Sequence, residues 1–505
     1  MKESFRCLLR TISPVHIGCD EVYEPMGFVL DEQGRRLITF DPLSFIATLG
    51  EEQRKNFSAI CMKGTISSIL EIYQFLKGRQ ATGRTVNVCQ GFIEQHQRTL
   101  SIPLQDTKKI QQELNNFIIA RTSFGISDNR PFIPGSAIKG SIRTAYLNAL
   151  AKVKEIPRPE GKGASKELEK TLLDGGAFST DPFRMVRVSD FKPVGETITM
   201  ILYAVNEKKT PSQFEARGPF QILEVIEPGS IFEGWITVEQ PEKEAGIKRP
   251  ISLSALLDSC NRFYTNEKRR EDGELHTMGI PNMPIPERNG KQFLVRLGRH
   301  SGAESVTIEG YRAIKIMRER GQKPKLEEHA TTLWLASDMS KPKAKGNLKP
   351  FGWALLEELT VDRAQGFEKK EKEWRTLFEK ERTEQLAVEK KGLEEQLDKA
   401  RKLQEAQRIK EETERIKEEE QQRRKAELEA MSPEERDIAL IRAGELSEER
   451  VVEIYNKIDS FSIDNRKTLA QALKEYWIGH EKWEGKLSNK QKIKVEKIKG
   501  ILGDT

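Results

Sequence analysis

Apolar and polar residues alternate from Ser4 to Thr11, and this period of two predicts a β-strand. Phe5, Cys7 and Leu9 fall on one face of the strand, and Arg6 and Arg10 fall on the other. The chain is therefore expected to open with an amphipathic strand.

Two short apolar runs, Phe28–Leu30 and Leu37–Phe40, flank a polar turn and predict a hairpin. Asp41 and Pro42 follow, and a capping aspartate before a proline at the first helical position predicts a helix. Further helices are expected over 51–78, 106–120 and 251–271, and further strands over Met185–Val188, Thr197–Val205, Gln221–Ile226, Ile231–Val238, Phe293–Leu297 and Trp353–Leu359.

A Pro-Gly turn, Glu227–Ser230, lies between two of these strands and predicts a second hairpin. Strands and helices are thus mixed over residues 1–360, which favours an α+β fold for this part.

The pattern changes at residue 361. Of the 70 residues in 361–430, 39 are charged, and this composition predicts a long helix. Its apolar residues give only a broken heptad, so a coiled-coil hairpin or dimer and a solvated single helix both remain open. Ser432 and Glu435 then form the pattern of a capping box, which opens a small helical unit over 431–505.

Composition narrows the class of protein. The 505 residues are 37% hydrophobic and 32% charged, enough for at least one large core. No run reaches the roughly 18 apolar residues of a membrane helix, so no membrane partner is expected. The five cysteines are scattered and never spaced as CxxC, which favours a reduced, cytoplasmic protein without structural zinc. The sequence contains no metal or nucleotide motif, and no cofactor is expected.

The net charge of +6 is unevenly placed. Residues 361–430 carry 19 basic and 20 acidic residues, and 431–505 carry 14 of each. The remaining 51 basic and 44 acidic residues give 1–360 a charge of +7. This excess is a modest indication of a polyanionic partner.

A glycine-containing stretch, Phe132–Ala145, carries the clearest chemistry. Ser136 is a good helix N-cap, Lys139 and Arg143 lie four residues apart on the helix that follows, and Gly135 and Gly140 leave room for another backbone. Free N–H groups beside two cations suit a phosphate. An ordinary capped helix with two solvated charges fits the pattern equally well.

Further basic residues could contact the phosphates of RNA without reading its bases. The segment Gly298–Gly302 is predicted to be an RNA-facing or hairpin loop. It lacks the glycine spacing of a nucleotide-binding fold. The candidates outside the first stretch are Arg130, Arg296, Arg299, His300 and Lys345.

His16 is a weak catalytic candidate. It follows the first strand, where a histidine could act as the general base of a metal-independent ribonuclease. No partner histidine, tyrosine or lysine stands nearby in the sequence, so a structural role at the strand end is the favoured interpretation.

Several motifs together resemble the RAMP superfamily of CRISPR-associated proteins, and within it the family of the fifth Csm subunit of type III-A effector complexes. The resemblance covers about 1–360. The motifs that carry it are Ser13–Gly18, Tyr23–Pro25, Ile133–Arg143, Arg187–Asp190 and Leu348–Trp353.

The resemblance implies a ferredoxin-like (RRM-like) core, with a second divergent half. It implies a non-catalytic backbone or cap subunit that binds guide RNA (crRNA) near its 3′ end, supports its maturation in antiviral defence, and contacts neighbouring Csm subunits and target RNA. The crRNA-binding role falls on Ser136, Lys139, Gly140 and Arg143. Two alternatives remain: an endoribonuclease that uses His16, and a scaffold that works through 366–505 and a protein partner of unknown kind.

Overall fold

The structure is a computed structural model that describes residues 2–175, 177–210, 212, 216, 218–242, 245–286, 291–317, 322–485 and 487–503. It divides into two compact units, unit 1 (Met1–Leu393) and unit 2 (Glu394–Thr505). Among the helices of the described residues, none combines the length and the apolar character needed to span a membrane.

Sheet A of unit 1 is built around the opening strand. β1 (Lys2–Thr11) pairs antiparallel with β11 (Ile231–Glu239) on one side and with β17 (Trp353–Glu358) on the other. The strand order is β12-β17-β1-β11-β7, with β8 also beside β11. The remaining strands of the sheet are β12 (Gln292–Arg296), β7 (Val186–Val188) and β8 (Lys192–Pro193).

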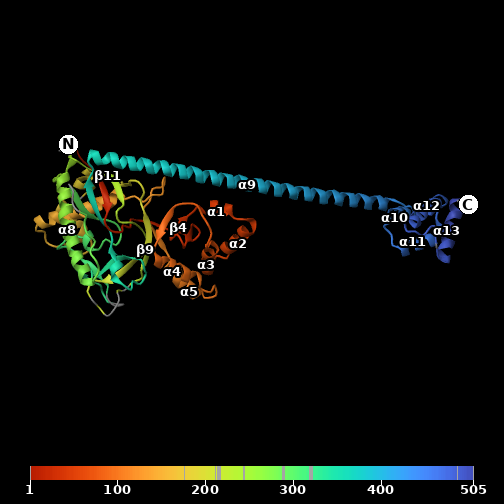
Figure 1. Ribbon diagram of the computed structural model, residues 1–505, viewed down its shortest axis with the longest axis horizontal. Coiled ribbons are helices and arrows are strands. Elements are labelled where there is room, and N and C mark those ends of the chain that lie inside the picture. The colour runs from red at the N-terminus through yellow and green to blue at the C-terminus, as the bar shows by residue number, and fades with distance from the viewer. Residues whose placement is uncertain are drawn as a thin grey trace. The chain divides into compact units, whose positions relative to one another are not determined.

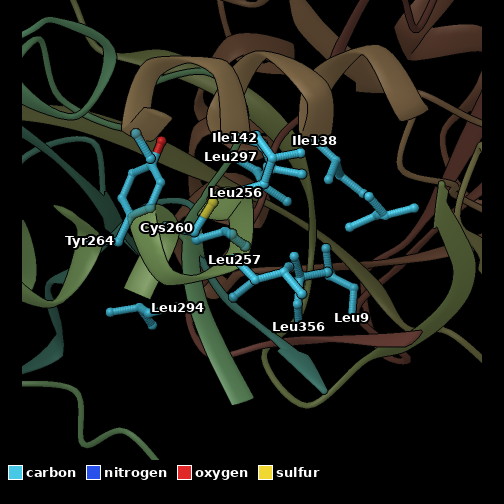
Figure 2. Close-up of a cluster of buried hydrophobic side chains, with 14 of the residues drawn as sticks. Leu9, Ile138, Ile142, Leu256, Leu257, Cys260, Tyr264, Leu294, Leu297 and Leu356 are labelled. Carbon is cyan, nitrogen blue, oxygen red and sulfur yellow. The ribbon is translucent and has the colours of Figure 1, made fainter. Parts of the chain in front are cut away.

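Two helices cover one face of sheet A and form the main core with it. They are α6 (Gly135–Val153) and α8 (Leu253–Met278). Figure 2 shows Ile138 and Ile142 from α6 close to Cys260 and neighbouring side chains of α8, with Leu9 of β1 and Leu356 of β17 below them. Phe5 and Cys7 belong to the same cluster as Leu9, which confirms the predicted inward face of β1.

The start of the long helix α9 (Val361–Ala430) lies on the other face of sheet A. Leu8 of β1 packs there with Ala364 and Phe367, and Figure 1 shows α9 beginning beside β11. Arg6 reaches both Glu233 of β11, at 2.6 Å, and Glu368 of α9, at 3.1 Å. The face of β1 that was predicted to be charged therefore binds the start of α9, through the ion pair of Arg6 with Glu368.

Sheet B has nine strands in the order β2-β6-β10-β9-β5-β4-β3, with β15 pairing β9 and β16 pairing β15. Its core is formed mainly with α3 and α4. Its strands are β2 (Gly18–Val22), β3 (Phe28–Asp31), β4 (Arg36–Thr39), β5 (Thr85–Val88), β6 (Ile119–Thr122), β9 (Thr199–Lys208), β10 (Gln221–Ile226), β15 (Thr332–Ser337) and β16 (Lys349–Pro350). The other helices of unit 1 are α1 (Pro42–Thr48), α2 (Glu51–Met62), α3 (Ile66–Leu76), α4 (Gln90–Leu100), α5 (Thr107–Asn115) and α7 (Ala164–Leu173), and a separate hairpin joins β13 (Ile314–Ile316) to β14 (Lys325–Glu327).

The first predicted hairpin is confirmed, and the second is wrong. β3 pairs with β4, and the Asp41 side chain accepts from the Ser44 N–H at the start of α1, as expected. The turn at 227–230, however, joins β10 of sheet B to β11 of sheet A, which are not paired with each other. Gly229 donates its N–H to the Thr11 carbonyl at 2.8 Å, so the turn ties the two sheets together.

Residues 361–430 form one continuous helix, so the chain does not reverse within this stretch. From 379 to 427, every residue whose burial the structure describes is exposed. Ion pairs four residues apart, such as Lys402 with Asp398 and Arg423 with Glu427, support the helix. The structure therefore favours a solvated helix over a coiled-coil hairpin.

The helices that follow α9 share a small core of their own. Ser432 and Glu435 form the predicted capping box, and Trp477 and Trp483 are buried. The helices are α10 (Pro433–Ala443), α11 (Glu448–Asn456), α12 (Ile463–Gly479) and α13 (Asn489–Leu502).

Candidate nucleic-acid interface

The N-terminus of α6 is covered by the end of β7. The helix begins at Gly135, and the Gly135 N–H donates to Asp190 at 2.8 Å. Ser136 lies inside the helix and its side chain caps nothing, which corrects the prediction that it is the N-cap. A Cβ on Gly135 would lie 2.3 Å from the Val188 carbonyl oxygen. The backbone that comes close to Gly135 is therefore that of the protein itself, at the end of β7.

The two cations of α6 that were predicted to bind phosphate have partners within unit 1. Lys139 donates its ammonium to the Val186 carbonyl at 2.8 Å, and burial lowers its pKa. Arg143 pairs with Glu169 at 2.7 Å and with Asp181 at 3.0 Å. Gly140 is exposed, and a Cβ added there would meet no described atom within 4 Å. Asp190 thus covers the N-terminus of α6, where the phosphate was predicted to bind. The two cations predicted to bind that phosphate already have partners in the protein.

Arg130 fastens the start of α9 to the rest of unit 1. Its two terminal nitrogens donate to the Glu371 carboxylate at 2.9 and 2.8 Å, and its guanidinium lies 3.5 Å from the centre of the Trp374 ring. Glu371 also accepts from the Gly195 N–H at 3.0 Å. These donors lower the pKa of Glu371 to about 2, although burial acts the other way.

Arg296 is an internal residue. Its side chain is fully buried, 2.5 Å from the equally buried Glu271 carboxylate. Its guanidinium also lies over Trp353, and Trp353 donates its indole N–H to the same carboxylate. The prediction that Arg296 contacts RNA phosphate is corrected, because no part of its side chain reaches solvent.

His300 is held in place by unit 1. It lies 3.2 Å from the Gln221 amide oxygen and packs against Trp334 and Phe351, with ring centres 4.7 and 5.5 Å away. Burial lowers its pKa to about 3, so the imidazole is neutral near pH 7. It therefore carries no charge for the phosphate contact predicted for it.

His16 is also buried, with no exposed surface. Its Nδ1 donates to the Glu224 carbonyl at 2.7 Å, and burial lowers its pKa. The Glu224 carboxylate accepts from Tyr23 at 2.9 Å and pairs with Arg84. A side chain in this position cannot reach a substrate, and the contact with Glu224 supports the structural interpretation of His16.

Two exposed cations, Arg299 and Lys349, belong to segments that lie against residues 13–18. The Arg299 N–H donates to the His16 carbonyl at 2.9 Å. Pro14 and Lys349 line a cavity of about 230 Å³, together with Glu227 and Asp338. Gly298 makes the contact of Arg299 with His16 possible, because its φ is +79° and a Cβ would lie 2.3 Å from the His16 carbonyl oxygen.

The side chains of these segments are free to meet a ligand. Arg299 and Lys345 are exposed, and neither forms an ion pair with any residue that the structure describes. The same holds for the other three lysines of the lysine-rich run that contains Lys345, which the sequence also suggested as phosphate contacts. They are Lys341, Lys343 and Lys349.

The described residues hold no group of three or more His, Cys, Asp or Glu side chains arranged to bind a metal ion. The exposed arginine and lysine side chains offer positive charge and hydrogen-bond donors, which suit a polyanion such as RNA.

A family model defines the class of protein. The model of the RAMP superfamily matches residues 8–485, and the chain belongs to this superfamily.

A curated relative is the "CRISPR system Cms protein Csm5" of Streptococcus thermophilus, 26% identical over 196 residues. The match covers 38% of this chain, and the chain spans about half the length of that relative, 52%. A chain in the cryo-EM structure of a Csm-crRNA-target RNA ternary complex of a type III-A CRISPR-Cas system is 18% identical, with a TM-score of 0.46 over 70% of this chain and 100% of that chain. The crystal structure of T. onnurineus Csm5 is 20% identical, with a TM-score of 0.43 over 69% of this chain and 99% of that chain.

Proposed function

We propose that the chain is an RNA-binding subunit of a type III-A Csm ribonucleoprotein, placed near the 3′ end of the crRNA and acting in its maturation. The observation that carries the RNA-binding part is that Arg299, Lys345 and Lys349 are exposed and form no ion pair with any residue that the structure describes. Membership of the RAMP superfamily and the likeness to a Csm5 protein support the assignment to a Csm complex. Neighbouring Csm subunits and target RNA are the further partners that we propose.

We further propose that sheet A and its two helices form a ferredoxin-like core. These elements follow one another in the chain as β1, α6, β7, β11, α8 and β17, with the strands of sheet B and other elements inserted between them. The four strands lie in the order β17-β1-β11-β7. All of their pairings are antiparallel. This order and these crossovers are the features expected of a βαββαβ unit. Sheet B is then the second, divergent half.

The RNA-binding surface that we propose consists of Arg299, Lys345 and Lys349. The test is equilibrium binding of a fluorescein-labelled single-stranded RNA to the full chain at several salt concentrations. Replacing all three residues by Ala should weaken binding at each concentration. It should also reduce the slope of log affinity against log salt concentration by about 2, because each phosphate contact on a single strand contributes roughly 0.7 to that slope.

Two control variants make the test specific. Lys380, Lys390 and Lys399 are exposed on α9, so their triple Ala variant has the same change in net charge at a different place. The double variant Lys139→Ala, Arg143→Ala tests whether the α6 cations contact RNA in spite of their internal partners. If the α9 variant or the α6 variant loses as much affinity as the loop variant, the surface is wrongly placed. If the unmodified chain fails to bind RNA, the proposed function fails.

A further inference from the structure

A cavity of about 560 Å³ lies between the start of α9 and the edge of sheet A. It is lined by the β7–β8 connection, the middle of β11 and the first four turns of α9, all within unit 1. Its size falls within the roughly 300–1,000 Å³ of small-molecule sites. The crRNA-binding residues implied by the family resemblance do not line it.

The carboxylates that line this cavity are already engaged. Glu233 and Glu368 both pair with Arg6, from the β1 side. Asp190 accepts the Gly135 N–H, and Glu371 is held by Arg130. Their negative charge is therefore largely compensated by donors that belong to the protein.

The lysines that line the cavity are not engaged. Lys192, at the start of β8, and Lys372, on α9, are exposed and form no ion pair within the described part of the chain. Arg375 adds a third cation, which shares Glu371 with Arg130. With Arg6 and Arg130 included, five cations stand against the four carboxylates of the lining, which leaves a surplus of one positive charge.

One wall of the cavity is an exposed aromatic ring. Trp235 projects from the outer face of β11 with 45% of its surface exposed, and Arg6 lies 5.6 Å from the centre of its ring. Pro193 and Phe367 add apolar surface nearby. A flat aromatic face beside unpaired cations is the combination that binds a base and its phosphate in single-stranded nucleic acid.

We propose that this cavity binds one nucleotide of a single-stranded RNA, with the base stacked on Trp235 and the flanking phosphates near Lys192 and Lys372. The proposal rests on the RNA-binding function proposed above and adds a second contact point, of a different kind, on sheet A. A peptide partner fits less well, because the surplus positive charge favours phosphate.

The experiment uses the full chain, a fluorescein-labelled single-stranded RNA, and three variants. Trp235→Ala should weaken binding about 10-fold, whereas Trp235→Phe keeps an aromatic face and should stay within about 3-fold of the unmodified chain. Phe178 is an even more exposed aromatic, 83% exposed with Arg184 over its ring, and does not line the cavity. Phe178→Ala should therefore leave the affinity unchanged.

Tryptophan fluorescence supplies a second readout that depends on direct contact. Unlabelled RNA should quench part of the emission of the unmodified chain, and Trp235→Phe should remove that part while RNA still binds. Unchanged affinity in Trp235→Ala together with unchanged quenching in Trp235→Phe overturns the nucleotide site. In that case a loss of binding in the Arg299, Lys345 and Lys349 variant would leave the proposed function standing, whereas no binding by the unmodified chain would remove both.

Discussion

Arg296 and Glu271 form an ion pair that is entirely removed from solvent. Two opposite charges in such a place stabilise each other, but each is costly to bury alone. The guanidinium also donates to the Phe351 carbonyl at 3.0 Å, and Trp353 donates to the carboxylate. The pair therefore links α8 to β12 and β17 at the base of the glycine-containing loop.

We expect Arg296→Met to lower the free energy of unfolding by about 3–5 kcal/mol, because it leaves the Glu271 carboxylate buried without its cation. Urea unfolding measures this change. The double variant Arg296→Met, Glu271→Gln removes both charges and should recover part of the loss. Equal stability of the single variant and the unmodified chain would show that the pair is not buried as described.

His300 makes stability depend on pH. Its pKa is lowered from 6.5 to about 3 by burial, so between these values the unfolded chain binds a proton there that the folded chain does not. Stability should therefore fall as the pH drops below about 6.5, by up to roughly 1.4 kcal/mol per pH unit from this group. His16 and His96, whose pKa values are also lowered, act in the same direction.

His300→Asn isolates this contribution, and Asn also tolerates the φ of +64° at this position. The free energy of unfolding is measured at pH 7, 6 and 5 for both proteins. We expect a smaller decrease with falling pH in the variant, whatever its stability at pH 7. Parallel curves would mean that His300 titrates normally in the folded chain.

The sequence showed which residues are charged, but not which charges are free. Arg130 was predicted to contact RNA, yet its main partner, Glu371, lies 241 positions later in the chain. Arg299 and Lys345 were predicted with the same reasoning and are exposed. No local pattern separates these cases, because the difference arises only when distant segments pack together.

Helix α6 contains two glycines with opposite surroundings. Gly135 is buried against the backbone at Val188 and Ser189, whereas Gly140 is exposed. The sequence suggested a close backbone approach at both, and the structure has it at Gly135 alone of the two. The start of α6 can therefore pack directly against the end of β7, because its first residue has no side chain.

We expect Gly135→Ala to destabilise the chain by about 1–3 kcal/mol, because its Cβ would overlap the Val188 and Ser189 carbonyl oxygens and force the helix to shift. Gly140→Ala is the matched control on the same helix. It should be neutral or stabilise by about 0.5–1 kcal/mol, since Ala favours a helix interior over Gly. Chemical denaturation compares the two, and equal effects would contradict the packing at the start of α6.

Local patterns predicted most elements of unit 1, and their failures have physical causes. Strand β11 has β1 as its partner rather than β10, so the turn at 227–230 could not be interpreted from its own residues. Helix α4 escaped prediction because its buried face includes Gln95 and His96. Gln95 is satisfied there by the Tyr203 hydroxyl, which donates to it at 2.7 Å, and that contact is invisible in the sequence.

At the scale of the whole molecule, the helices after α9 have a core separate from that of unit 1. Tyr455, Leu473, Trp477 and Ile498 are buried together in it. A core shared by four helices can support folding without the rest of the chain, although a unit of this size is only marginally stable. The helices α10 to α13 are therefore candidates for an independent domain.

We expect a fragment of residues 431–503 to unfold cooperatively by itself, with a red shift of tryptophan emission as Trp477 and Trp483 become exposed. Urea titration followed by fluorescence measures this. Leu473→Ala should lower the stability of the fragment by about 2–5 kcal/mol, because it leaves a cavity in the core. A gradual change without a transition, or an inert Leu473→Ala, would show that the unit needs the rest of the chain.

The position of β1 in sheet A has a consequence for biosynthesis. Its neighbours are residues 231–239 and 353–358, so β1 leaves the ribosome well before either of its partners has been made. At about 5–20 residues per second, that wait is on the order of tens of seconds. During this time a nascent strand with an apolar face is exposed to chaperones and to other nascent chains, and co-translational folding of unit 1 has to proceed from sheet B.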